Sequence, residues 1–559
     1  MAAPDIIAQL EQIAARLGAD GTPVTLERPR NPDHGDFATN LAMILAKRLG
    51  RPPRDIAADV IEAFDAAAAG VASTEIAGPG FINFRLAAGR VQARVVEIIA
   101  ADSGYGRAET GGGHRIQVEF VSANPTGPLH VAHGRGAALG DAIASLLEWT
   151  GYDVQREFYV NDAGVQIDRL AESLEARWLQ QTGGEASVPE GGYHGAYLTD
   201  LAAELEADHG AELRTMERLA RLKWFRDRAT TRLREEQDRH LREFGVRFDH
   251  YFSETSLYEE GRLQETLDEL DRLGLTYREG GATWLRTSAY GDDKDRVLVK
   301  SDGSFTYFLP DLAYHRDKAR RGFDHVIDIW GADHHGYVPR MKAALSALGL
   351  PDFLDVEVVQ MVRLVRGGQE VKFSKRAGDI VTLKDLITWT GPDVARYFFL
   401  MRRGDAQMVF DLDLALDQSE KNPVYKVQYA HARMCSIFRK AGLERSAVAP
   451  DTDVSRLEHP AEQELIRQLE QFPEVVARAA DARSPHLVCD YLETTAGLVN
   501  SWYHAGNPSR SPELAVLASD DDLRMARLAL ARAVQITLRN GLQLLGLHAP
   551  ERMQREESE

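Results

Sequence analysis

Hydrophobic and polar positions along the chain change their arrangement near residue 110. Before this point, helical periodicity and one short apolar segment predict two helices and a strand, at residues 6–17, 41–49 and 80–86. A composition typical of a linker follows at residues 102–114. Beyond the linker, the pattern predicts a strand, a helix and a strand, at residues 116–121, 139–150 and 152–158. This order of elements predicts a parallel α/β unit.

The rest of the chain extends this α/β pattern. Charged helical stretches indicate an insertion between two halves of one fold, at residues 170–180, 198–207, 213–244 and 261–273. Strands are predicted again at residues 297–300, 307–309, 326–330 and 356–362. From about residue 390 onward the pattern predicts helices and no strand.

The expected fold class is therefore α/β, with a Rossmann-like parallel sheet that carries a helical insertion. A small α+β domain precedes it and an all-α domain follows. The expected domain boundaries are residues 1–110, 111–420 with the insertion at about 168–290, and 421–559.

Composition narrows the class of protein. A chain of 559 residues is too long for one core, and its 44% hydrophobic and 27% charged residues are ordinary for a globular protein. Cys435 and Cys489 are the only cysteines, which excludes a disulfide framework and a cysteine-built zinc site and fits the cytoplasm. No apolar run is long enough for a membrane, and no signal or transit peptide is evident. The net charge of −19 argues against nucleic-acid binding by the whole surface, although a local basic track stays open.

A phosphate-binding motif is predicted where the first strand of the α/β unit ends. A loop rich in proline and glycine leads to His130 and His133, which share one face of the first turn of a helix. Free amides at a helix N-terminus attract phosphate, and two imidazoles can stabilise charge that develops during phosphoryl or adenylyl transfer. Two alternatives stay open: histidines that only cap the helix, and a dinucleotide site built from Gly134, Gly136 and Gly140 with Glu157 as the ribose-binding acid.

A second motif, Lys372-Phe-Ser-Lys-Arg, follows a predicted strand and two glycines. Lys372 and Lys375 are charges on long flexible stems, suited to hold a departing pyrophosphate, and Ser374 can contact phosphate. A basic surface turn is the alternative for this segment alone. The two motifs in this order in one chain indicate adenylyl transfer from ATP.

At these residues the chain resembles the class I aminoacyl-tRNA synthetases, and its longer context is similar to the arginyl-tRNA synthetase family. The similar segments span nearly the whole chain and lie at residues 31–40, 122–130, 159–164, 330–336, 427–433 and 541–551. The first motif has Ala132 where the general pattern has glycine, which puts the close approach of adenine in doubt.

The resemblance implies that ATP and L-arginine form arginyl-adenylate, and that the arginyl group then passes to the terminal ribose of tRNA(Arg). The residues that match the family's catalytic positions are His130, His133, Lys372, Ser374 and Lys375. The residues implied in ATP binding are His130, Ala132, His133, Gly134, Gly331, Asp333, Lys372 and Lys375. The residues implied in arginine binding are Ser122, Ala123, Asn124, His133, Tyr307 and Asp311. A carboxylate such as that of Asp311 suits the fork of a guanidinium.

The same resemblance assigns tRNA contacts to both ends of the chain. The first domain resembles a module that binds the tRNA elbow, and its expected contacts are Asn31, Phe37 and Asn40. The last domain resembles an anticodon-binding domain, with Tyr425, Tyr429 and Arg433 along one helical stripe. Half-buried packing is the alternative role of these tyrosines. A monomer is expected, with Mg²⁺ entering with ATP, no zinc and no metal-binding residues of its own.

Two other functions stay open on the sequence. One is a class I synthetase of another amino-acid specificity, and the other is a tRNA-binding relative without catalytic activity. The second is disfavoured because both histidines and both lysines are present.

Overall fold

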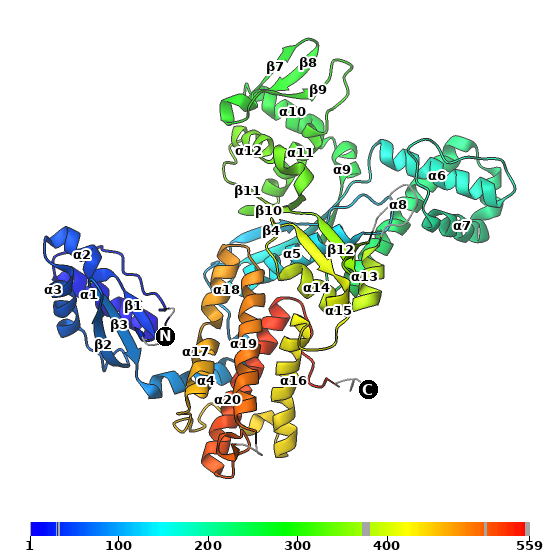
Figure 1. Cartoon of the computed structure of the whole chain (residues 1–559). Helices are drawn as coiled ribbons and strands as arrows, with labels where there is room; N and C mark the ends of the chain where they lie inside the picture. The colour runs from blue at the N-terminus through cyan, green and yellow to red at the C-terminus, as the bar shows by residue number, and fades with distance from the viewer. Residues whose placement is uncertain (1, 30, 32–33, 372–380, 508–510, 554–559) are drawn as a thin grey trace. The chain divides into compact units, whose positions relative to one another are not determined.

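The computed structural model describes residues 2–29, 31, 34–371, 381–507 and 511–553 (Figure 1). The chain divides into two compact units. Unit 1 comprises Met1–Ser103, Met434–Gln471 and Gly497–Ile536; unit 2 comprises Gly104–Arg433, Phe472–Ala496 and Thr537–Glu559. The helices of the predicted C-terminal domain are thus distributed over both units. The domain boundaries predicted from the sequence stay predictions.

An antiparallel sheet of order β1-β3-β2, with helices packed against it, forms the first part of unit 1 (Figure 1). Its elements are α1 (Ala2–Arg16), β1 (Phe37–Thr39), α2 (Leu41–Leu49), α3 (Pro53–Ala63), β2 (Val71–Ala77) and β3 (Phe81–Leu86). The helices and the strand predicted here are confirmed to within a few residues. Gly35 adopts a φ of 91°, and a Cβ at this position would lie 2.6 Å from the carbonyl oxygen of Phe84. Only glycine is accommodated in that turn without strain.

Two helices from distant parts of the sequence pack together in unit 1. They are α4 (Ala88–Ala101) and α17 (Pro460–Glu470). Arg94 Nε lies 3.2 Å from Glu470 Oε1, and the Gln92 side chain donates to the carbonyl oxygen of Leu457 at 3.0 Å.

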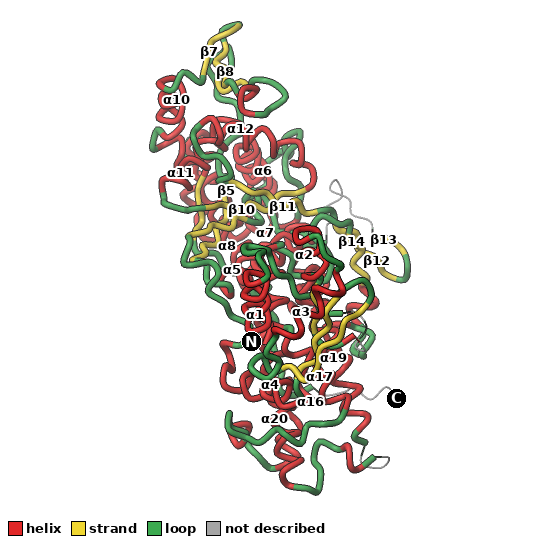
Figure 2. The backbone as a smooth tube through the Cα atoms, turned by 90° about the vertical axis from the view of Figure 1, so that its left-hand side faces the viewer, coloured by secondary structure: helices red, strands yellow, loops and turns green. Residues whose placement is uncertain are grey.

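A five-stranded parallel sheet of order β11-β10-β4-β5-β6 forms the centre of unit 2. Its strands are β4 (Arg115–Glu119), β5 (Asp153–Val160), β6 (His250–Ser253), β10 (His325–Gly331) and β11 (Leu354–Val359). Figure 2 shows the neighbouring strands β10 and β11 within this layer. The predicted parallel α/β fold is confirmed. Because the strands are parallel, their carboxyl ends lie at one edge, which is where such sheets place ligands.

Helix α5 (Val131–Trp149) connects β4 to β5 and is buried over most of its surface. It packs against β4, β5 and β10 and against three helices, α13 (Leu383–Thr390), α14 (Pro392–Leu400) and α18 (Phe472–Asp481). A helix enclosed on most sides is expected to be mainly apolar, and its buried charged residues, Arg135 and Asp141, are paired with backbone carbonyls and with arginines. The helix that begins with the first motif is therefore a central element of unit 2.

The predicted helical insertion is confirmed in its first half and only in part beyond it. Three helices with their own apolar cluster are present, α6 (Val165–Gln181), α7 (Ala196–Thr215) and α8 (Arg218–Glu243). The single helix predicted at 213–244 is wrong, because the chain leaves helical geometry between Thr215 and Arg218. In the second half the helix predicted at 261–273 is confirmed, but β6 of the main sheet and two strands of another sheet are also present, so a helical assignment throughout to residue 290 is wrong. Short strands between charged helices give a weak alternating pattern, which the helical periodicity around them obscures.

A compact group of elements packs beside the main sheet around α11 (Phe308–Arg320) (Figure 1). Its other members are α9 (Glu254–Glu259), α10 (Arg262–Arg272), β7 (Thr276–Glu279), β8 (Ala282–Leu285), β9 (Arg296–Val299) and α12 (Val338–Ala347). The strand predicted at 307–309 is wrong, since α11 begins at Phe308. Three apolar residues fit a strand or a buried helix equally well, and the following ten residues continue the helix.

A small separate sheet has the order β13-β12-β14 (Figure 2). Its strands are β12 (Val362–Arg366), β13 (Gln369–Glu370) and β14 (Met408–Asp411). The one strand predicted at 356–362 is therefore two strands, β11 and β12, in different sheets. The expectation of no strand after residue 390 is also wrong, because β14 pairs with β12 in parallel and short α15 (Leu412–Leu416) follows it.

Beyond residue 420, the part of the chain that the structure describes forms helices and no strand. The remaining helices are α16 (Pro423–Ala441), α19 (His486–Ala505) and α20 (Asp521–Leu544). None of the described helices is long and apolar enough to span a membrane.

Two glycines of α5 provide a test of its close packing. A Cβ on Gly140 would lie 2.2 Å from Cγ of Phe120, whereas a Cβ on Gly136 would meet nothing within 4 Å. We expect Gly140→Ala to destabilise unit 2 by about 1–3 kcal/mol through overpacking. Gly136→Ala should be neutral or stabilising by up to about 1 kcal/mol, because alanine favours the helix. Thermal unfolding of both variants checks this, and equal midpoints would contradict the packing of Gly140 on Phe120.

Candidate functional site

The two histidines of the first motif lie at the start of α5. His130 is the N-cap residue, and its ring stacks on that of His133 with centroids 3.7 Å apart. The backbone amide of His130 donates to Nδ1 of His133 at 3.2 Å. A neutral His133 ring therefore carries its hydrogen on Nε2, where it can be donated to a ligand. Both rings are half-buried beside the amides of the first helical turn, an arrangement suited to an anion.

Described residues just after the second motif lie beside the first motif. Lys372, Ser374 and Lys375 are outside the described residues. Thr382 pairs with His130 as an antiparallel bridge, and the amide of Leu383 donates to the carbonyl oxygen of Leu129 at 2.8 Å. Thr382 and Asp385 form a capping box that starts α13 at this point. The first described residues after the second motif therefore lie at the start of α5.

A strained turn follows β4 and precedes the first motif. Val121 has a φ of 68° and Ser122 a φ of 40°, values that are rare outside glycine. Ser122 Oγ donates to Glu119 Oε1 at 2.8 Å and accepts from the amide of Tyr159 at 3.2 Å. Strained backbone of this kind persists where surrounding contacts hold it, and it is common at functional sites. Here β5 and the end of β4 hold the turn.

Helix α8 holds the next part of the same loop. The buried side chain of Gln237 donates to the carbonyl oxygens of Asn124 and Gly127, at 3.1 and 2.8 Å. The Asn124 amide donates to Gln166 Oε1 at 2.5 Å. Sequence reasoning missed Gln237, because one amide in a charged helix carries no distinguishing pattern. The predicted insertion therefore helps to place Asn124.

Asp311 lies on the first turn of α11, and Tyr337 holds its carboxylate. The hydroxyl of Tyr337 donates to Asp311 Oδ2 at 2.5 Å. Burial raises the pKa of Asp311, while this hydrogen bond opposes the rise. Tyr307, the other residue predicted on this segment, is 85% exposed. Sequence reasoning missed Tyr337, although it directly follows the similar segment at 330–336.

A second carboxylate, that of Glu254, lies near Asp311 and is buried more deeply. It is 7% exposed, and burial first, then the charges of Asp311 and Asp162, raise its pKa to about 7, against a hydrogen bond from Tyr159. Within the described part of the chain, neither Glu254 nor Asp311 forms an ion pair with a lysine, arginine or histidine. A buried and a half-buried carboxylate without a cation are costly unless a ligand supplies one. Glu254 was missed because it lies at the end of a strand that was itself missed.

The residues predicted to contact the nucleotide lie at neighbouring strand ends. Gly331 ends β10, and Asp333 follows it with an exposed side chain. Ala132 is half-buried and Gly134 is buried in the first turn of α5, where a Cβ on Gly134 would lie 2.8 Å from Leu383 Cδ1. Because β10 pairs with β4 in parallel, both groups lie at the carboxyl edge of the sheet.

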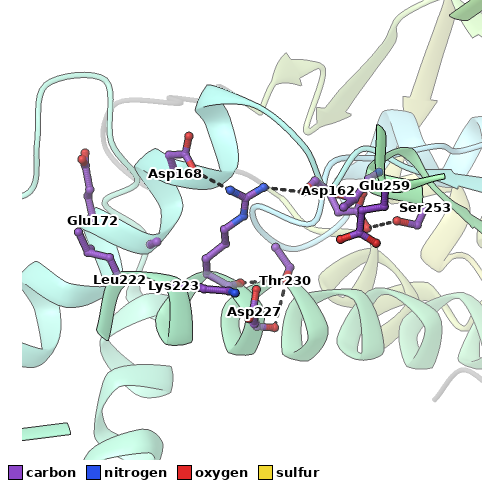
Figure 3. A pocket seen from close by; sticks show the side chains of 12 residues that line it. Asp162, Asp168, Glu172, Leu222, Lys223, Asp227, Thr230, Ser253 and Glu259 are labelled. Carbon is purple, nitrogen blue, oxygen red and sulfur yellow. Dashed lines mark hydrogen bonds and ion pairs between the residues drawn. The ribbon is translucent and has the colours of Figure 1, made fainter. Parts of the chain in front are cut away.

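A cavity of about 750 Å³ lies between α6, α8 and the ends of β5 and β6 (Figure 3). Ser253 Oγ and the amide of Thr255 donate to the carboxylate of Asp162, at 2.6 and 2.9 Å. Arg226 pairs with Asp168 at 3.0 Å within the lining. Asp162 in the cavity wall thus holds Ser253 and Thr255, the residues on either side of Glu254. None of the predicted site residues lines the cavity.

The dinucleotide alternative is not supported by the place of Glu157. This side chain is fully buried, and its oxygens accept hydrogen bonds from Tyr314 and Arg321, the former at 2.5 Å. It is therefore not presented to a ribose. The described residues contain no group of three or more carboxylate, histidine or cysteine side chains that could hold a metal ion.

The three residues predicted to contact tRNA in unit 1 differ in their exposure to solvent. Phe37 is 4% exposed, and the guanidinium of Arg28 lies 4.6 Å from its ring centroid. The burial of this ring argues against the tRNA contact predicted for Phe37, because a core ring has no open face. Asn31 is exposed, and Asn40 is half-buried ahead of α2.

The three contacts predicted near residue 430 do lie along one helix. Tyr425, Tyr429 and Arg433 are half-buried on successive turns of α16. The guanidinium of Arg433 lies 4.7 Å from the ring centroid of Tyr429. The predicted stripe exists, and Arg433 already covers one face of Tyr429.

Three family models match consecutive parts of the chain. They are the arginyl-tRNA synthetase N-terminal domain at residues 4–86, the class I (R) tRNA synthetase catalytic domain at 94–390, and the DALR anticodon-binding domain at 427–553. The chain is 48% identical to arginine–tRNA ligase 1 of Halalkalibacterium halodurans over 97% of its length and 96% of that protein. It is 46% identical to the arginine–tRNA ligase of Bacillus subtilis, over 95% and 94% of the two chains.

The chain belongs to the arginyl-tRNA synthetase family. The arginyl-tRNA synthetase of Thermus thermophilus has the same fold, with a TM-score of 0.73 and 24% identity over 99% of this chain and 100% of that one. The family resemblance noted in the sequence is thereby confirmed, and so are the class I catalytic fold and the helical C-terminal part.

Tyr337→Phe tests the support of Asp311. Loss of the hydroxyl removes a hydrogen bond to the ionised carboxylate, so the pKa of Asp311 rises further. A carboxyl whose pKa is raised by folding costs stability as the pH rises through that pKa. We expect the variant to lower the midpoint of thermal unfolding, and more at pH 8 than at pH 5. Tyr290→Phe, at a 40% exposed tyrosine, is the control. Equal shifts at both pH values would contradict the assignment.

Proposed function

We propose that this protein is an arginine–tRNA ligase, which joins L-arginine to tRNA(Arg) with ATP. The observation that carries the proposal is the pair of carboxylates without an ion-pair partner, the half-buried Asp311 and the buried Glu254, near the sheet edge that also bears the class I motif. A cationic side chain is the ligand that such a pair requires. The curated relatives named arginine–tRNA ligase support the same conclusion.

The carboxylate of arginine attacks the α-phosphorus of ATP, which forms arginyl-adenylate and releases pyrophosphate. His130 and His133 donate to phosphate oxygens as charge develops on them, together with the amides of α5. Gly134, Ala132, Gly331 and Asp333 surround the nucleoside. Lys372 and Lys375 hold the pyrophosphate as it leaves, and Ser374 contacts it.

The guanidinium and the α-ammonium group give arginine two positive centres, and the site offers two carboxylates. Asp311, held by Tyr337, binds the guanidinium in a charge-assisted hydrogen bond. Ser122, Ala123, Asn124 and His133 bind the rest of the amino acid, with Tyr307 over the pocket. Glu254 binds the second positive centre. Neutral amino acids of similar size leave one or both carboxylates unpaired, so they are rejected.

A hydroxyl of the terminal ribose of tRNA(Arg) then attacks the arginyl carbonyl, and AMP leaves. Asn31 and Asn40 contact the tRNA elbow, while Tyr425, Tyr429 and Arg433 contact the anticodon. The protein acts as a monomer in the cytoplasm. Mg²⁺ enters bound to the phosphates of ATP. The roles assigned above to protein residues do not depend on it.

Exchange of labelled pyrophosphate into ATP, with each of the twenty amino acids and with or without tRNA, tests the proposal. Exchange with arginine alone among the amino acids is the expected result. Exchange supported by another amino acid would indicate a different class I specificity. Inactivity under every condition, with tRNA still bound, would indicate a tRNA-binding protein without catalysis.

Asp311→Asn keeps the shape of the side chain and removes its charge. We expect the KM for arginine to rise about 10- to 100-fold, because a hydrogen bond to a charged group contributes about 1.5–3 kcal/mol. The KM for ATP should change less than about twofold. Asp302→Asn, at an exposed position, should change neither constant. An unchanged arginine KM in Asp311→Asn would place the guanidinium elsewhere.

The ionisation of Glu254 predicts a pH dependence. With a pKa of about 7, Glu254 is mostly protonated at pH 6 and ionised at pH 8. Because only the carboxylate attracts a cation, kcat/KM for arginine should rise up to about tenfold per pH unit below 7 and level off above it. Glu254→Gln should lower kcat/KM and flatten this acid limb. A limb of the same position and slope in Glu254→Gln would show that another group titrates.

A further inference from the structure

Four ionisable side chains form a buried cluster beneath the predicted arginine pocket. They come from three elements: Glu119 ends β4, His315 and Lys318 lie on α11, and Asp328 lies in β10. The Lys318 and Asp328 side chains are 0% and 1% exposed, and the other two side chains are below 10%. We call these four residues the α11 cluster. None of them was predicted as a site residue.

Lys318 joins the two strands to the helix. Its Nζ donates to Glu119 Oε2 at 2.6 Å and to Asp328 Oδ1 at 2.9 Å. Burial alone would lower the pKa of Lys318, but the charges of Asp328 and Glu119 outweigh it and raise the pKa. The ammonium therefore stays charged between two carboxylates that belong to neighbouring strands.

His315 extends the same cluster toward Asp311. Its Nε2 lies 2.9 Å from Asp328 Oδ2, and its Nδ1 lies 2.7 Å from the backbone carbonyl oxygen of Asp311. The ring therefore contacts β10 through one nitrogen and the first turn of α11 through the other.

The other end of the cluster reaches the strained turn after β4. Glu119 Oε2 accepts from Lys318, and its Oε1 accepts from Ser122 Oγ at 2.8 Å. Ser122 Oγ in turn accepts from the amide of Tyr159. One continuous series of hydrogen bonds therefore connects the two sides of the pocket, through Ser122, Glu119, Lys318, Asp328, His315 and Asp311.

Stability alone is a poor explanation for this arrangement. Removing several charges from water is expensive, and a buried ion pair is often no more stabilising than apolar residues of the same volume. Directional hydrogen bonds, in contrast, fix a separation that apolar packing leaves adjustable. The hydrogen bonds of the α11 cluster fix the distance between Ser122 and α11.

We propose that Lys318 is a positioning residue for arginine, which sets the distance between the Ser122–Asn124 segment and Asp311 by tying Glu119 and Asp328 to α11. The proposal rests on the proposed function, since it assigns these two segments to opposite sides of the arginine pocket. Among the described residues, the hydrogen bonds and ion pairs of the cluster do not involve the nucleotide positions Gly134 and Asp333. Substitution of Lys318 therefore raises the KM for arginine and leaves the KM for ATP unchanged.

The test is the double variant Lys318→Met with Glu119→Gln. It removes one positive and one negative charge together, so the net charge of the cluster stays the same. The amide oxygen that the second substitution introduces still accepts from Ser122, while the link to α11 is lost. In aminoacylation of tRNA(Arg) by the full chain, we expect the KM for arginine to rise at least tenfold. The KM for ATP should stay within twofold of wild type.

A matched control comes from unit 1, which contains none of the residues of the predicted arginine pocket. The side chains of Glu462 and Arg527 are 2% and 4% exposed, and they pair at 2.7 Å. Glu462→Gln with Arg527→Met therefore removes a buried ion pair of the same kind. It should lower the unfolding midpoint without a change in either KM. A rise of the arginine KM to the same extent in this control would overturn the proposal.

Three further outcomes would decide against the proposal or against the proposed function. A folded Lys318→Met/Glu119→Gln protein with both KM values unchanged, or with both raised equally, shows a purely structural cluster. If circular dichroism shows that this variant does not fold, Lys318→Arg keeps the charge but alters its position, and an arginine KM within twofold of wild type overturns the proposal. Wild-type protein without arginine-dependent activity instead contradicts the proposed function, which is a separate result.

Discussion

Parallel pairing of β4 with β5 and β10 is the constraint on which the site depends. It brings the ends of three strands to one edge, so that Ser122, Tyr159 and Gly331 become neighbours although they are far apart in sequence. The chain turns away from the sheet directly after β4, where Val121 and Ser122 have positive φ. Contacts from β5 and from Glu119 hold the strained turn in place.

Charge is arranged in two layers under this edge. In the α11 cluster, two carboxylates are hydrogen-bonded to a lysine and a histidine, so both find their partners within the protein. Beside it, Asp311 is half-buried and Glu254 is buried, and the described residues provide neither with an ion-pair partner. The first layer is complete and rigid, whereas the second requires a cation from outside. This difference is a physical basis for selecting a cationic amino acid in a protein with a net charge of −19.

Local patterns predicted the elements that form independently of their surroundings. The helix at 41–49 was placed at its observed bounds, and the strand before the first motif within two residues. Prediction failed where contacts with distant parts of the chain determine the secondary structure of a segment. The segment 307–309 has the composition of a strand but starts α11, and β6, β7 and β14 are too short to produce a period of their own. Phe37 matched a family segment, yet only the packed domain shows that it is a core residue.

The sequence by itself determined the two motifs, their order and the family, because these depend on residue identities at short spacings. Asp311 was also predicted, since it lies in a segment similar to the family. Tertiary structure decided which groups surround it: Tyr337 and Glu254 come from elements after β10 and β6, and Gln237 comes from the insertion. A residue becomes part of a site through its place in space and its burial. Those depend on long-range pairing of strands and helices, which no local pattern contains.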